Sequence, residues 1–495
     1  MMSRRAETST WKVFTLSLVF SHRPSRRAFL RTGVGLALAP LCFSGNARAD
    51  DGAEIRLKAA PARASFGGPD GKLTDVLAYN GVLPGPVLRL KQGQLARIIV
   101  QNGLDEDTTM HWHGIRLPNA MDGVPGLTQA PIKPGESFTY EFTPPDAGTF
   151  WYHPHFDSFQ QIGRGLAGVL IVEEREPPSF DRDLLWVLQD WRLTYGGQIA
   201  SGFGSMMDAA MSGRIGNLVT INGVKPADLS VKAGERIRLR LANASLARMM
   251  ALHFEGHSPT VIALDGQPCK PHAPENGRIV LAPAMRADVV IDMMGKPAAR
   301  FAVIDDFYEG LSYTLTNLAY DAGPPLRKQI LDAAPALPSN PLPVPDLANA
   351  VRQEIILQGG MMGGGKLKGM GGMNGMAMPG MGGSPVWAIN GMSMTGDGAA
   401  TMEPMFTLQR GQSCRIMLRN ETAWWHPMHI HGFSMKLITR NGAPVSHKQW
   451  QDTVLLAPKD VFECAFVADN PGNWMLHCHV ADHQMSGLMT VFRVI

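Results

Sequence analysis

A segment of ten residues that occurs three times constrains the fold more than any other feature. Each copy begins with glycine, alternates apolar with polar residues and ends with asparagine: GQLARIIVQN at 93–102, GERIRLRLAN at 234–243 and GQSCRIMLRN at 411–420. Alternation with period two after a turn predicts a half-buried β-strand. An Asn-Gly pair, a strong turn signal, stands upstream of each copy, at Asn80-Gly81, Asn222-Gly223 and Asn390-Gly391. Three copies of one β unit are therefore expected.

A second strand recurs in the first and third units. Residues 137–155 and 461–479 share Phe-x-x-x-Phe, a turn with glycine, an aromatic residue and a final His-x-His. The middle unit offers only MRADVVIDM at 285–293, which has no histidine. The sequence thus predicts an all-β protein of three consecutive Greek-key barrels or sandwiches, with metal ligands in the first and third.

Composition and the positions of glycine and proline indicate the boundaries of these units. The 495 residues include 53 glycines and 36 prolines, which favour short strands and many turns. We expect domains at 50–175, 176–325 and 351–495, with a stiff Pro-rich linker at 326–350 and a Met/Gly-rich insert at 359–382 in the third.

The first 49 residues are predicted to be a twin-arginine signal peptide. The pattern SRRAFLR at 25–31 precedes a mild apolar run at 34–43 and the small-residue cleavage signature Ala47-Arg48-Ala49. That run is too short to span a bilayer, so we expect export of the folded protein to the periplasm. The leader carries eight basic residues and one acidic residue, so the formal charge of +3 becomes −4 without it. This charge gives no indication of a nucleic-acid partner.

The five cysteines have different expected fates. Cys42 leaves with the leader. An oxidising compartment permits a disulfide among Cys269, Cys414 and Cys464, and their spacing leaves the pairing open. Cys478 is expected to bind metal.

Ten of the fifteen histidines fall into four short motifs: HWHG at 111–114, WYHPH at 151–155, HPMHIHG at 426–432 and HCHVADH at 477–483. On a strand, residues i and i+2 face one side and residue i+1 faces the other. His477 and His479 should therefore reach one site, while Cys478 reaches another. His429 and His431 share a face, and His426 falls on the opposite one. The sequence predicts two metal sites on the two sides of one strand.

Ligand chemistry indicates copper at both sites. Two histidines and a cysteine thiolate, here His426, His483 and Cys478, form the trigonal set that suits blue copper. The other site can gather eight imidazoles, more than one zinc ion needs, because a catalytic zinc takes three protein ligands. A cluster of several coppers fits better, and the order His-Cys-His makes one strand both the ligand of two sites and the link between them.

These motifs, in this order and with three repeated units, resemble the multicopper oxidase family, which includes laccases and bacterial cuprous oxidases. The resemblance implies cupredoxin-like domains and four copper ions: one type 1, one type 2 and two type 3. By the family pattern Cys478, His426 and His483 would hold the type 1 copper, and His111 and His429 the type 2 copper. The type 3 pair would be held by His113, His153, His155, His431, His477 and His479. Family members oxidise one-electron donors at type 1 and reduce dioxygen to water at the three-copper cluster.

The resemblance also assigns roles to three other residues. Leu488, ten residues after Cys478, stands where the family has its axial ligand, and a leucine cannot coordinate. Asp122 resembles a carboxylate near the type 2 copper that relays protons, although an Asp before Gly is also an ordinary turn residue. Asp452 resembles a segment near the type 1 edge, where it could take a phenolic proton, hold a cation or simply end a strand. Gln484 stands where many bacterial relatives have a glutamate, and it cannot relay protons as an acid.

Methionines are concentrated in a Gly-rich tract that cannot pack a core. The thioethers that could bind Cu(I) there are Met361, Met362, Met370, Met373, Met376, Met378 and Met381. Soft thioethers select Cu(I), whereas adaptable apolar filler is the plainer interpretation. A smaller set, Met206, Met207 and Met211, lies in the second unit.

The resulting hypothesis is that the chain is a periplasmic, monomeric multicopper oxidase with dioxygen as electron acceptor and Cu(I) as electron donor, in a copper-tolerance role. Oxidation of small phenols in the laccase manner is the runner-up. A non-enzymatic copper-binding scaffold is the alternative from another class, and a zinc hydrolase is the weakest choice.

Overall fold

The computed structural model describes residues 47–48, 54–66, 71–362, 386–396, 403–447 and 449–495. Most of the expected signal peptide and the methionines Met370, Met373, Met376, Met378 and Met381 lie outside these residues. Within them the chain forms three successive pairs of β-sheets with few helices, which confirms the all-β prediction. Among the described helices none is long and apolar enough to cross a membrane.

The first pair of sheets is built from residues 47–173. Its five-stranded sheet has the order β1 (Ala47–Arg48), β4 (Gly85–Lys91), β9 (Gly168–Glu173), β8 (Gly148–His153), β6 (His111–His113). Its four-stranded sheet has the order β3 (Thr74–Tyr79), β2 (Ile55–Ala64), β5 (Ala96–Asn102), β7 (Ser137–Phe142). The short helices are η1 (Asn119–Met121) and α1 (Ser158–Gly163).

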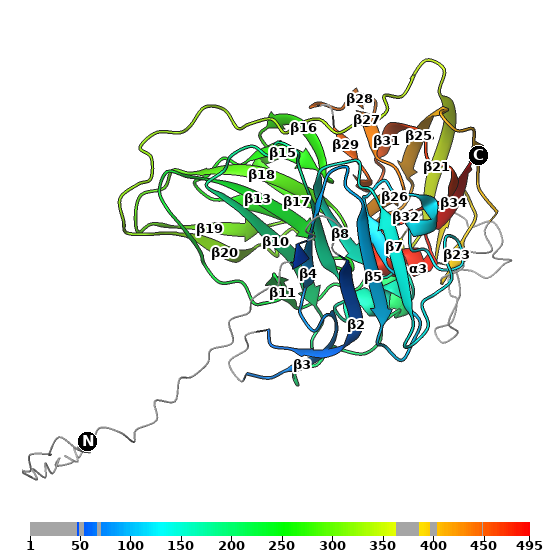
Figure 1. Ribbon diagram of the computed structural model, residues 1–495, viewed down its shortest axis with the longest axis horizontal. Coiled ribbons are helices and arrows are strands. Elements are labelled where there is room, and N and C mark those ends of the chain that lie inside the picture. The colour runs from blue at the N-terminus through cyan, green and yellow to red at the C-terminus, as the bar shows by residue number, and fades with distance from the viewer. Residues whose placement is uncertain (1–46, 49–53, 67–70, 363–385, 397–402, 448) are drawn as a thin grey trace, which may run out of the picture. The chain divides into compact units, whose positions relative to one another are not determined.

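The second pair of sheets follows, drawn in green in Figure 1. One sheet has the order β11 (Leu218–Ile221), β10 (Arg182–Trp191), β13 (Glu235–Asn243), β18 (Arg286–Met293), β15 (Thr260–Leu264), β16 (Gln267–His272). The other has the order β12 (Leu229–Val231), β20 (Tyr313–Tyr320), β19 (Arg300–Asp305), β14 (Met250–Phe254), β17 (Arg278–Leu281). The helices are α2 (Met206–Ala210) and η2 (Glu275–Gly277). Residues 321–350, which include the Pro-rich span, form no helix or strand although all of them are described.

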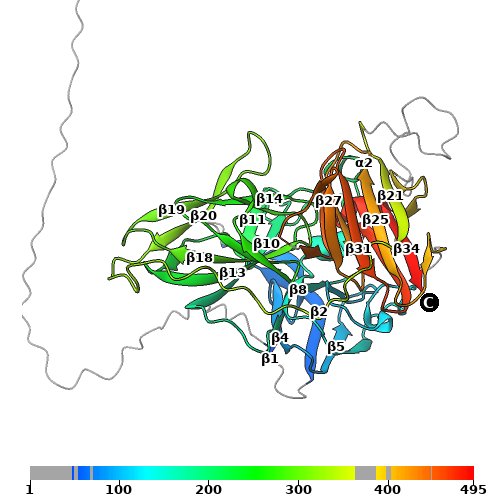
Figure 2. The ribbon, with the colours of Figure 1, turned by 90° about the horizontal axis from the view of Figure 1, so that it is seen from above.

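The third pair of sheets carries two of the histidine motifs. One sheet has the order β22 (Trp387–Ile389), β21 (Val351–Gly359), β25 (Ser413–Asn420), β31 (Val461–Val467), β27 (Met435–Arg440), β28 (Ala443–Pro444), with β29 (Trp450–Gln451) also on β27. Figure 2 shows β21, β25, β31 and β27 side by side. The other has the order β24 (Thr407–Leu408), β34 (Met489–Val494), β32 (Gly472–Cys478), β26 (His426–Ile430), β30 (Thr453–Leu456). A small ribbon, β23 (Met394–Thr395) with β33 (Ser486–Gly487), and the helix α3 (Ala481–Met485) complete it.

The repeated asparagines make the same hydrogen bonds in all three units. The side-chain amide of Asn102 donates to the main-chain oxygens of Glu106 and Ile132, and its carbonyl accepts from the main-chain nitrogen of Leu104. Asn243 and Asn420 form the equivalent bonds. Each amide donates to a main-chain oxygen five or four residues ahead and to another 38 or 37 residues ahead, and each carbonyl accepts from the main-chain nitrogen two residues ahead. A buried asparagine that satisfies three main-chain groups explains why the residue recurs, because those groups would otherwise be buried without partners.

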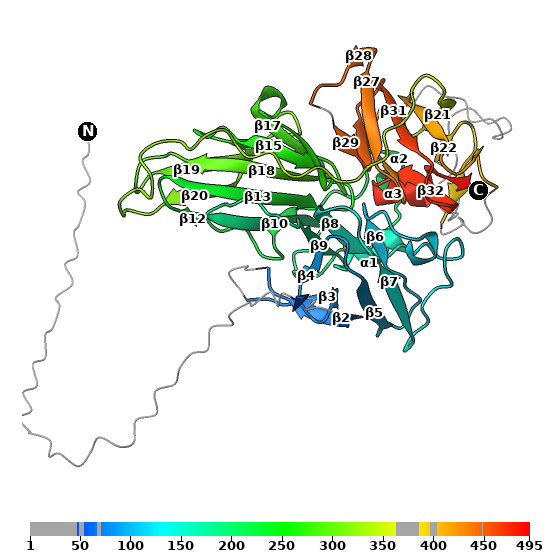
Figure 3. The same ribbon diagram turned by 45° about the horizontal axis from the view of Figure 1, so that its top comes forward.

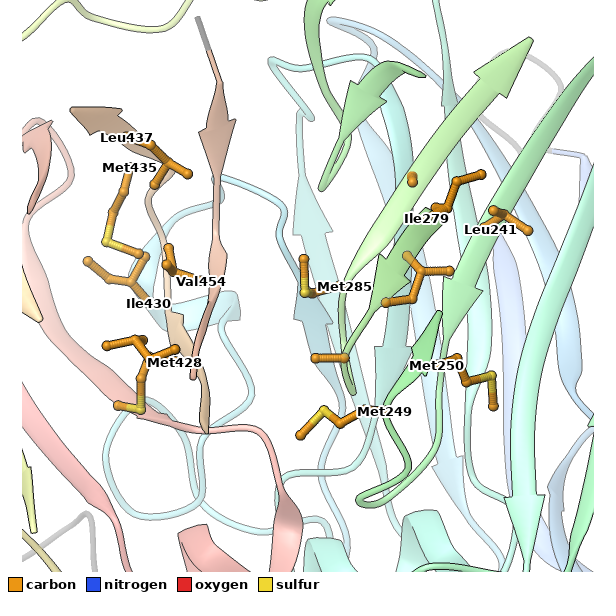
Figure 4. Packing of buried hydrophobic residues seen from close by; sticks show 14 of the residues in the cluster. Leu241, Met249, Met250, Ile279, Met285, Met428, Ile430, Met435, Leu437 and Val454 are labelled. Atoms are coloured by element: carbon orange, nitrogen blue, oxygen red, sulfur yellow. The ribbon is translucent and has the colours of Figure 1, made fainter. Parts of the chain in front are cut away.

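One hydrophobic core extends through the second and third units. It includes Leu241 and Met285 from the second and Met428 and Ile430 from the third, all buried. Figure 4 shows these side chains together with Met249, Met250 and Met435. These methionines behave as ordinary apolar filler, unlike the methionines at the surface described below.

Replacement of a repeated asparagine tests this account of the fold. In Asn243→Ala, three main-chain groups lose their partner, and leaving buried polar groups unsatisfied costs about 1–3 kcal/mol each. We expect a fall of about 3 kcal/mol in the free energy of unfolding, seen as a lower thermal midpoint by calorimetry.

The matched control is Asn317→Ala, since Asn317 forms an exposed bond to Asp228. We expect a change within about 0.5 kcal/mol there. Equal midpoints for the two variants would contradict the role assigned to the repeated asparagine.

Candidate metal centres

Strand register brings the histidine motifs opposite one another. In β6 and β8, His111 pairs with His153. In β26 and β32, His429 pairs with His477, and Met428 pairs with Cys478. The motifs of the first unit then meet those of the third, because the rings of His113 and His429 stack with centroids 3.7 Å apart.

Eight buried imidazoles line one site. They are His111, His113, His153, His155, His429, His431, His477 and His479. On six of them an outer ring nitrogen donates a hydrogen bond to the surrounding protein, as His111 Nδ1 does to the main-chain oxygen of Asp122 at 2.7 Å.

The inner nitrogens of this site lack protein partners. Buried ring nitrogens without a hydrogen bond to any described residue are His111 Nε2, His113 Nδ1, His153 Nε2, His155 Nε2, His429 Nε2 and His479 Nε2. His431 Nε2 and His477 Nε2 face each other at 3.0 Å. Buried polar atoms normally find partners, so this many unpartnered nitrogen lone pairs fit a metal cluster whose ions the imidazoles would bind.

Cys478 lies on the other side of the same strand. Its sulfur is 3.5 Å from His426 Nδ1 and 3.7 Å from His483 Nδ1, and those two nitrogens are 3.2 Å apart. All three groups are buried. This geometry is a three-ligand set of one sulfur and two nitrogens, separate from the eight imidazoles, and it fits the trigonal copper site in donor chemistry.

Burial keeps these groups neutral in the absence of metal. It lowers the pKa of His113, His153, His155, His431, His477 and His479 well below the ordinary value, with neighbouring histidines lowering it further. Burial also lowers the pKa of His483 to about 3 and raises the pKa of the Cys478 thiol. Neutral imidazoles are the form that binds metal, so the histidines need no deprotonation near neutral pH.

Comparison with known proteins agrees with this donor set. Three family profiles, each described as multicopper oxidase, match residues 64–177, 182–320 and 379–495. The chain is similar to multicopper oxidase MmcO of Mycobacterium tuberculosis, at 29% identity over 94% of this chain and 96% of that protein. It is also similar to copper resistance protein A of Escherichia coli, at 26% identity over 95% and 99%.

A solved structure supports the same grouping. The crystal structure of a multi-copper oxidase from Pseudomonas thermotolerans superimposes with a TM-score of 0.77 at 32% identity, over 91% of this chain and 100% of that one. The chain belongs to the multicopper oxidase family. It is a copper-dependent oxidoreductase that uses dioxygen and a reducing substrate. Its paired sheets are cupredoxin-like domains, as the sequence predicts.

In this multicopper oxidase Asp122 touches two imidazoles of the eight. Its carboxylate accepts from His431 Nδ1 at 2.9 Å, and its main-chain oxygen accepts from His111 Nδ1. The turn glycine Gly123 has φ +83°, and a Cβ there would lie 1.9 Å from the main-chain oxygen of Met110. The buried Asp122 thus orients one ring from each of the two units that supply histidines.

Asp452 lies elsewhere than the sequence suggests. It was expected at the type 1 edge, but the fully buried carboxylate accepts from His113 Nε2 at 3.0 Å, beside the eight-imidazole site. Its partner is Arg286 of β18, which donates to both carboxylate oxygens at 2.9 and 2.6 Å. An organic donor cannot deliver a proton to a group enclosed in this way, so the expected role for Asp452 in receiving a phenolic proton is corrected.

Arg286 itself was missed from the sequence. It stands in MRADVVIDM, which reads as an ordinary strand without histidines. One signal in the sequence could have found it: an arginine within a strand of mostly apolar residues. If such a strand is buried, its charge must be paired, because burying an unpaired charge is too costly.

Leu488 lies between β33 (Ser486–Gly487) and β34 (Met489–Val494), opposite Cys478 of β32. Leu488 belongs to the same buried cluster as Cys478, whereas Met489 belongs to another cluster with Val124 and Met475. The main-chain nitrogen of Cys478 donates to the oxygen of Leu488 at 3.0 Å. Alternation therefore places the leucine, and not the methionine, toward the sulfur.

Protein surrounds the outer edges of both histidines near Cys478. His483 Nε2 donates to the main-chain oxygen of Met211 at 2.7 Å, just after α2. His426 Nε2 contacts the hydroxyl of Thr422 at 2.9 Å. The buried indole of Trp387 packs against both rings, with centroids 4.5 Å from His483 and 4.9 Å from His426. Figure 3 shows α2 beside α3, which carries His483.

Both ends of the Met/Gly-rich tract leave the fold next to this centre. Gly359 pairs with Trp387, and the main-chain nitrogen of Met361 donates to the oxygen of Ala210 in α2. Met361 and Met362 are exposed, as are Met206 and Met207 of α2. These four thioethers thus lie at the surface.

The four cysteines in the described part of the chain form no disulfide. Cys269, Cys414, Cys464 and Cys478 are all buried and free.

Acid titration of the copper-free protein tests the burial of the imidazoles. Their folded pKa lies below the unfolded value of about 6.5, so stability is complete above that pH and is lost as the pH falls below it, by about 1.4 kcal/mol per pH unit for each group. We expect the thermal midpoint of copper-free protein to change little between pH 7.5 and 6.5 and to fall steeply from about pH 6.5 to 4.5. A midpoint that stays constant over this range would contradict the assigned burial.

Proposed function

We propose that this chain couples one-electron oxidation of a donor at a type 1 copper to four-electron reduction of dioxygen to water at a trinuclear copper cluster. Cys478, His426 and His483 would hold the type 1 ion. His111 and His429 would hold the type 2 ion, and the type 3 pair would take His113, His153, His155, His431, His477 and His479. The observation that carries the proposal is the set of six orphaned inner nitrogens in a buried cage of imidazoles.

The bound coppers would supply the redox chemistry, which no side chain in these sites can supply alone. The protein positions the ligands and joins the sites. Cys478 is bonded through the main chain to His477 on one side and His479 on the other, so the path between the two sites runs through about one residue in each direction. Leu488, which cannot coordinate, would leave the type 1 ion without a strong axial ligand and raise its potential.

Asp122 is the residue that we assign to proton supply. Dioxygen reduction consumes protons, and this buried carboxylate contacts His431 at 2.9 Å while its main chain holds His111. Gln484 cannot act as a second acid, so Asp122 would carry this role without it.

Cu(I) is the donor that we favour, in a copper-tolerance role. The support is the tract that holds Met370, Met373, Met376, Met378 and Met381, whose two ends lie beside Trp387 and α2. Exposed Met361 and Met362 continue it onto the described surface. Thioethers select Cu(I), and the similarity to a protein named copper resistance protein A points the same way.

Phenol oxidation in the laccase manner is the second candidate. It is favoured by the partly exposed indole of Trp425, which is next to His426 in the chain. The ring centroids of Trp425 and Phe307 lie 5.3 Å apart. An aromatic donor could stack there.

Three further expectations are carried as proposals. The twin-arginine pattern supports export of folded, copper-loaded protein to the periplasm. The three sheet pairs support domains at 50–175, 176–325 and 351–495 with the linker at 326–350 between the last two. A monomer is expected.

Replacement of the sulfur ligand tests the type 1 assignment. Cys478→Ser should abolish the blue absorbance and donor oxidation and reduce copper from about four to about three ions per chain, because the eight imidazoles are untouched. Copper analysis and absorption spectra check this result, with the buried Cys464→Ser as control. Wild-type protein that binds copper but consumes no dioxygen with any reductant would instead favour a non-enzymatic scaffold.

The identity of the electron donor is tested by substitutions that leave the length of the Met/Gly-rich tract unchanged. Replacing Met370, Met373, Met376, Met378 and Met381 together by leucine removes the thioethers and keeps Met361, whose main chain holds Trp424 and α2. We expect Cu(I) oxidation to fall about tenfold or more, with 2,6-dimethoxyphenol turnover unchanged. Unchanged Cu(I) oxidation would remove the tract from the proposal and leave phenols as the better candidate.

A further inference from the structure

All three units meet at one buried ion pair beside the eight-imidazole site. Arg286 comes from β18 of the second unit, and Asp452 comes from the third. The guanidinium also donates through Nε to the main-chain oxygen of Thr149 in the first unit at 3.2 Å. The second unit supplies none of the eight imidazoles, and Arg286 is a polar contact from that unit to the residues around this site.

The glycine of the HWHG motif makes room for this pair. Gly114 has φ +86°, and a Cβ at this position would lie 2.3 Å from Arg286 Nη2 and 2.5 Å from Asp452 Oδ2. Any larger residue would force the guanidinium or the carboxylate away from His113. The close approach is therefore built into the motif itself.

Arg286 and Asp452 stabilise each other's charge. Arg286 donates from both terminal nitrogens to the two oxygens of Asp452 at 2.9 and 2.6 Å, a two-pronged contact that favours the ionised carboxylate. A second carboxyl, Asp265, accepts from the main-chain nitrogens of Arg286 and Thr453 at 2.9 and 3.1 Å and so fixes the ends of the two segments.

An ionised Asp452 determines how two histidines face inward. A carboxylate can only accept, so His113 must donate from Nε2 and turn Nδ1 toward the interior. For each of the other seven described imidazoles the inner nitrogen is Nε2. The main-chain oxygen of Asp452 also accepts from His429 Nδ1 at 2.9 Å, which directs His429 Nε2 inward.

We propose that Arg286 is a positioning residue for the copper cluster: it holds Asp452 in place, and Asp452 sets the tautomer and orientation of His113 and His429. The inference rests on the proposed function, because it assumes that these nitrogens bind copper. The competing explanation is that Arg286 only anchors the second unit to the third. The two explanations differ in what happens to the cluster when the protein still folds.

The test compares Arg286→Gln with Arg238→Gln in the full chain. Arg238 is an equally buried arginine of the second unit that pairs with Asp288 at 2.6 Å and Glu174 at 2.7 Å but contacts none of the eight imidazoles. The readouts are copper ions per chain, the blue absorbance of the type 1 site, the EPR signal of the non-blue copper and the thermal midpoint of the copper-free form.

We expect Arg286→Gln to lose at least one copper per chain, or to shift the EPR parameters of the non-blue copper, while the blue absorbance per chain stays within about 20% of wild type. Arg286→Lys keeps the charge without the two-pronged contact and should restore part of the loss. Arg238→Gln should lower the midpoint of the copper-free form but keep the copper content and both spectra.

The inference is overturned if Arg286→Gln keeps wild-type copper content and EPR parameters, or if both arginine variants lose type 1 and cluster copper in equal proportion. Should Arg286→Gln not fold, Arg286→Lys and the isosteric Asp452→Asn replace it under the same criteria. Wild-type protein is measured in parallel: if it binds no copper cluster, the proposed function fails, whereas a normal wild type with an unaffected Arg286 variant defeats only this inference.

Discussion

The arrangement of both centres depends on the alternation of side chains along one strand. Successive side chains of β32 and the residue that follows it project to opposite faces, so Cys478 meets His426 and His483 while His477 turns toward the other imidazoles of the eight. The same parity separates His426 from His429 and His431 on the neighbouring strand, with which β32 is in register. A shift of one residue in this pairing would exchange sulfur for imidazole at both sites.

Burial turns this geometry into a site for metal. Ten imidazoles and a thiol are buried, and six of the inner ring nitrogens have no hydrogen-bond partner among the described residues, an arrangement that is costly for a chain without ions. Metal binding can offset that cost, so copper is expected to be part of the stability of the folded protein. The outer nitrogens are meanwhile fixed by Asp122, Asp452 and main-chain oxygens, which leaves the inner nitrogens in one orientation.

Local sequence patterns were sufficient to predict the strands and the metal-ligand motifs. The recurring asparagines mark the same three-bond turn in every unit, and strand parity divides the HCHVADH motif between two sites. Contacts across long separations were not accessible in this way. The place of Asp452 could not be predicted, because its partner Arg286 lies 166 positions away in the chain. The main-chain oxygen of Met211, which receives His483 from 272 positions away, carries no signal in a side chain at all.

The claim that the two centres lie on opposite sides of one strand is tested most directly by anomalous X-ray scattering at the copper edge from crystals of copper-loaded protein. The account predicts one copper bonded to Cys478 Sγ, His426 Nδ1 and His483 Nδ1, and a separate group of coppers enclosed by the eight imidazoles. A single ion bonded both to Cys478 Sγ and to a ring nitrogen of His477 or His479 would contradict it.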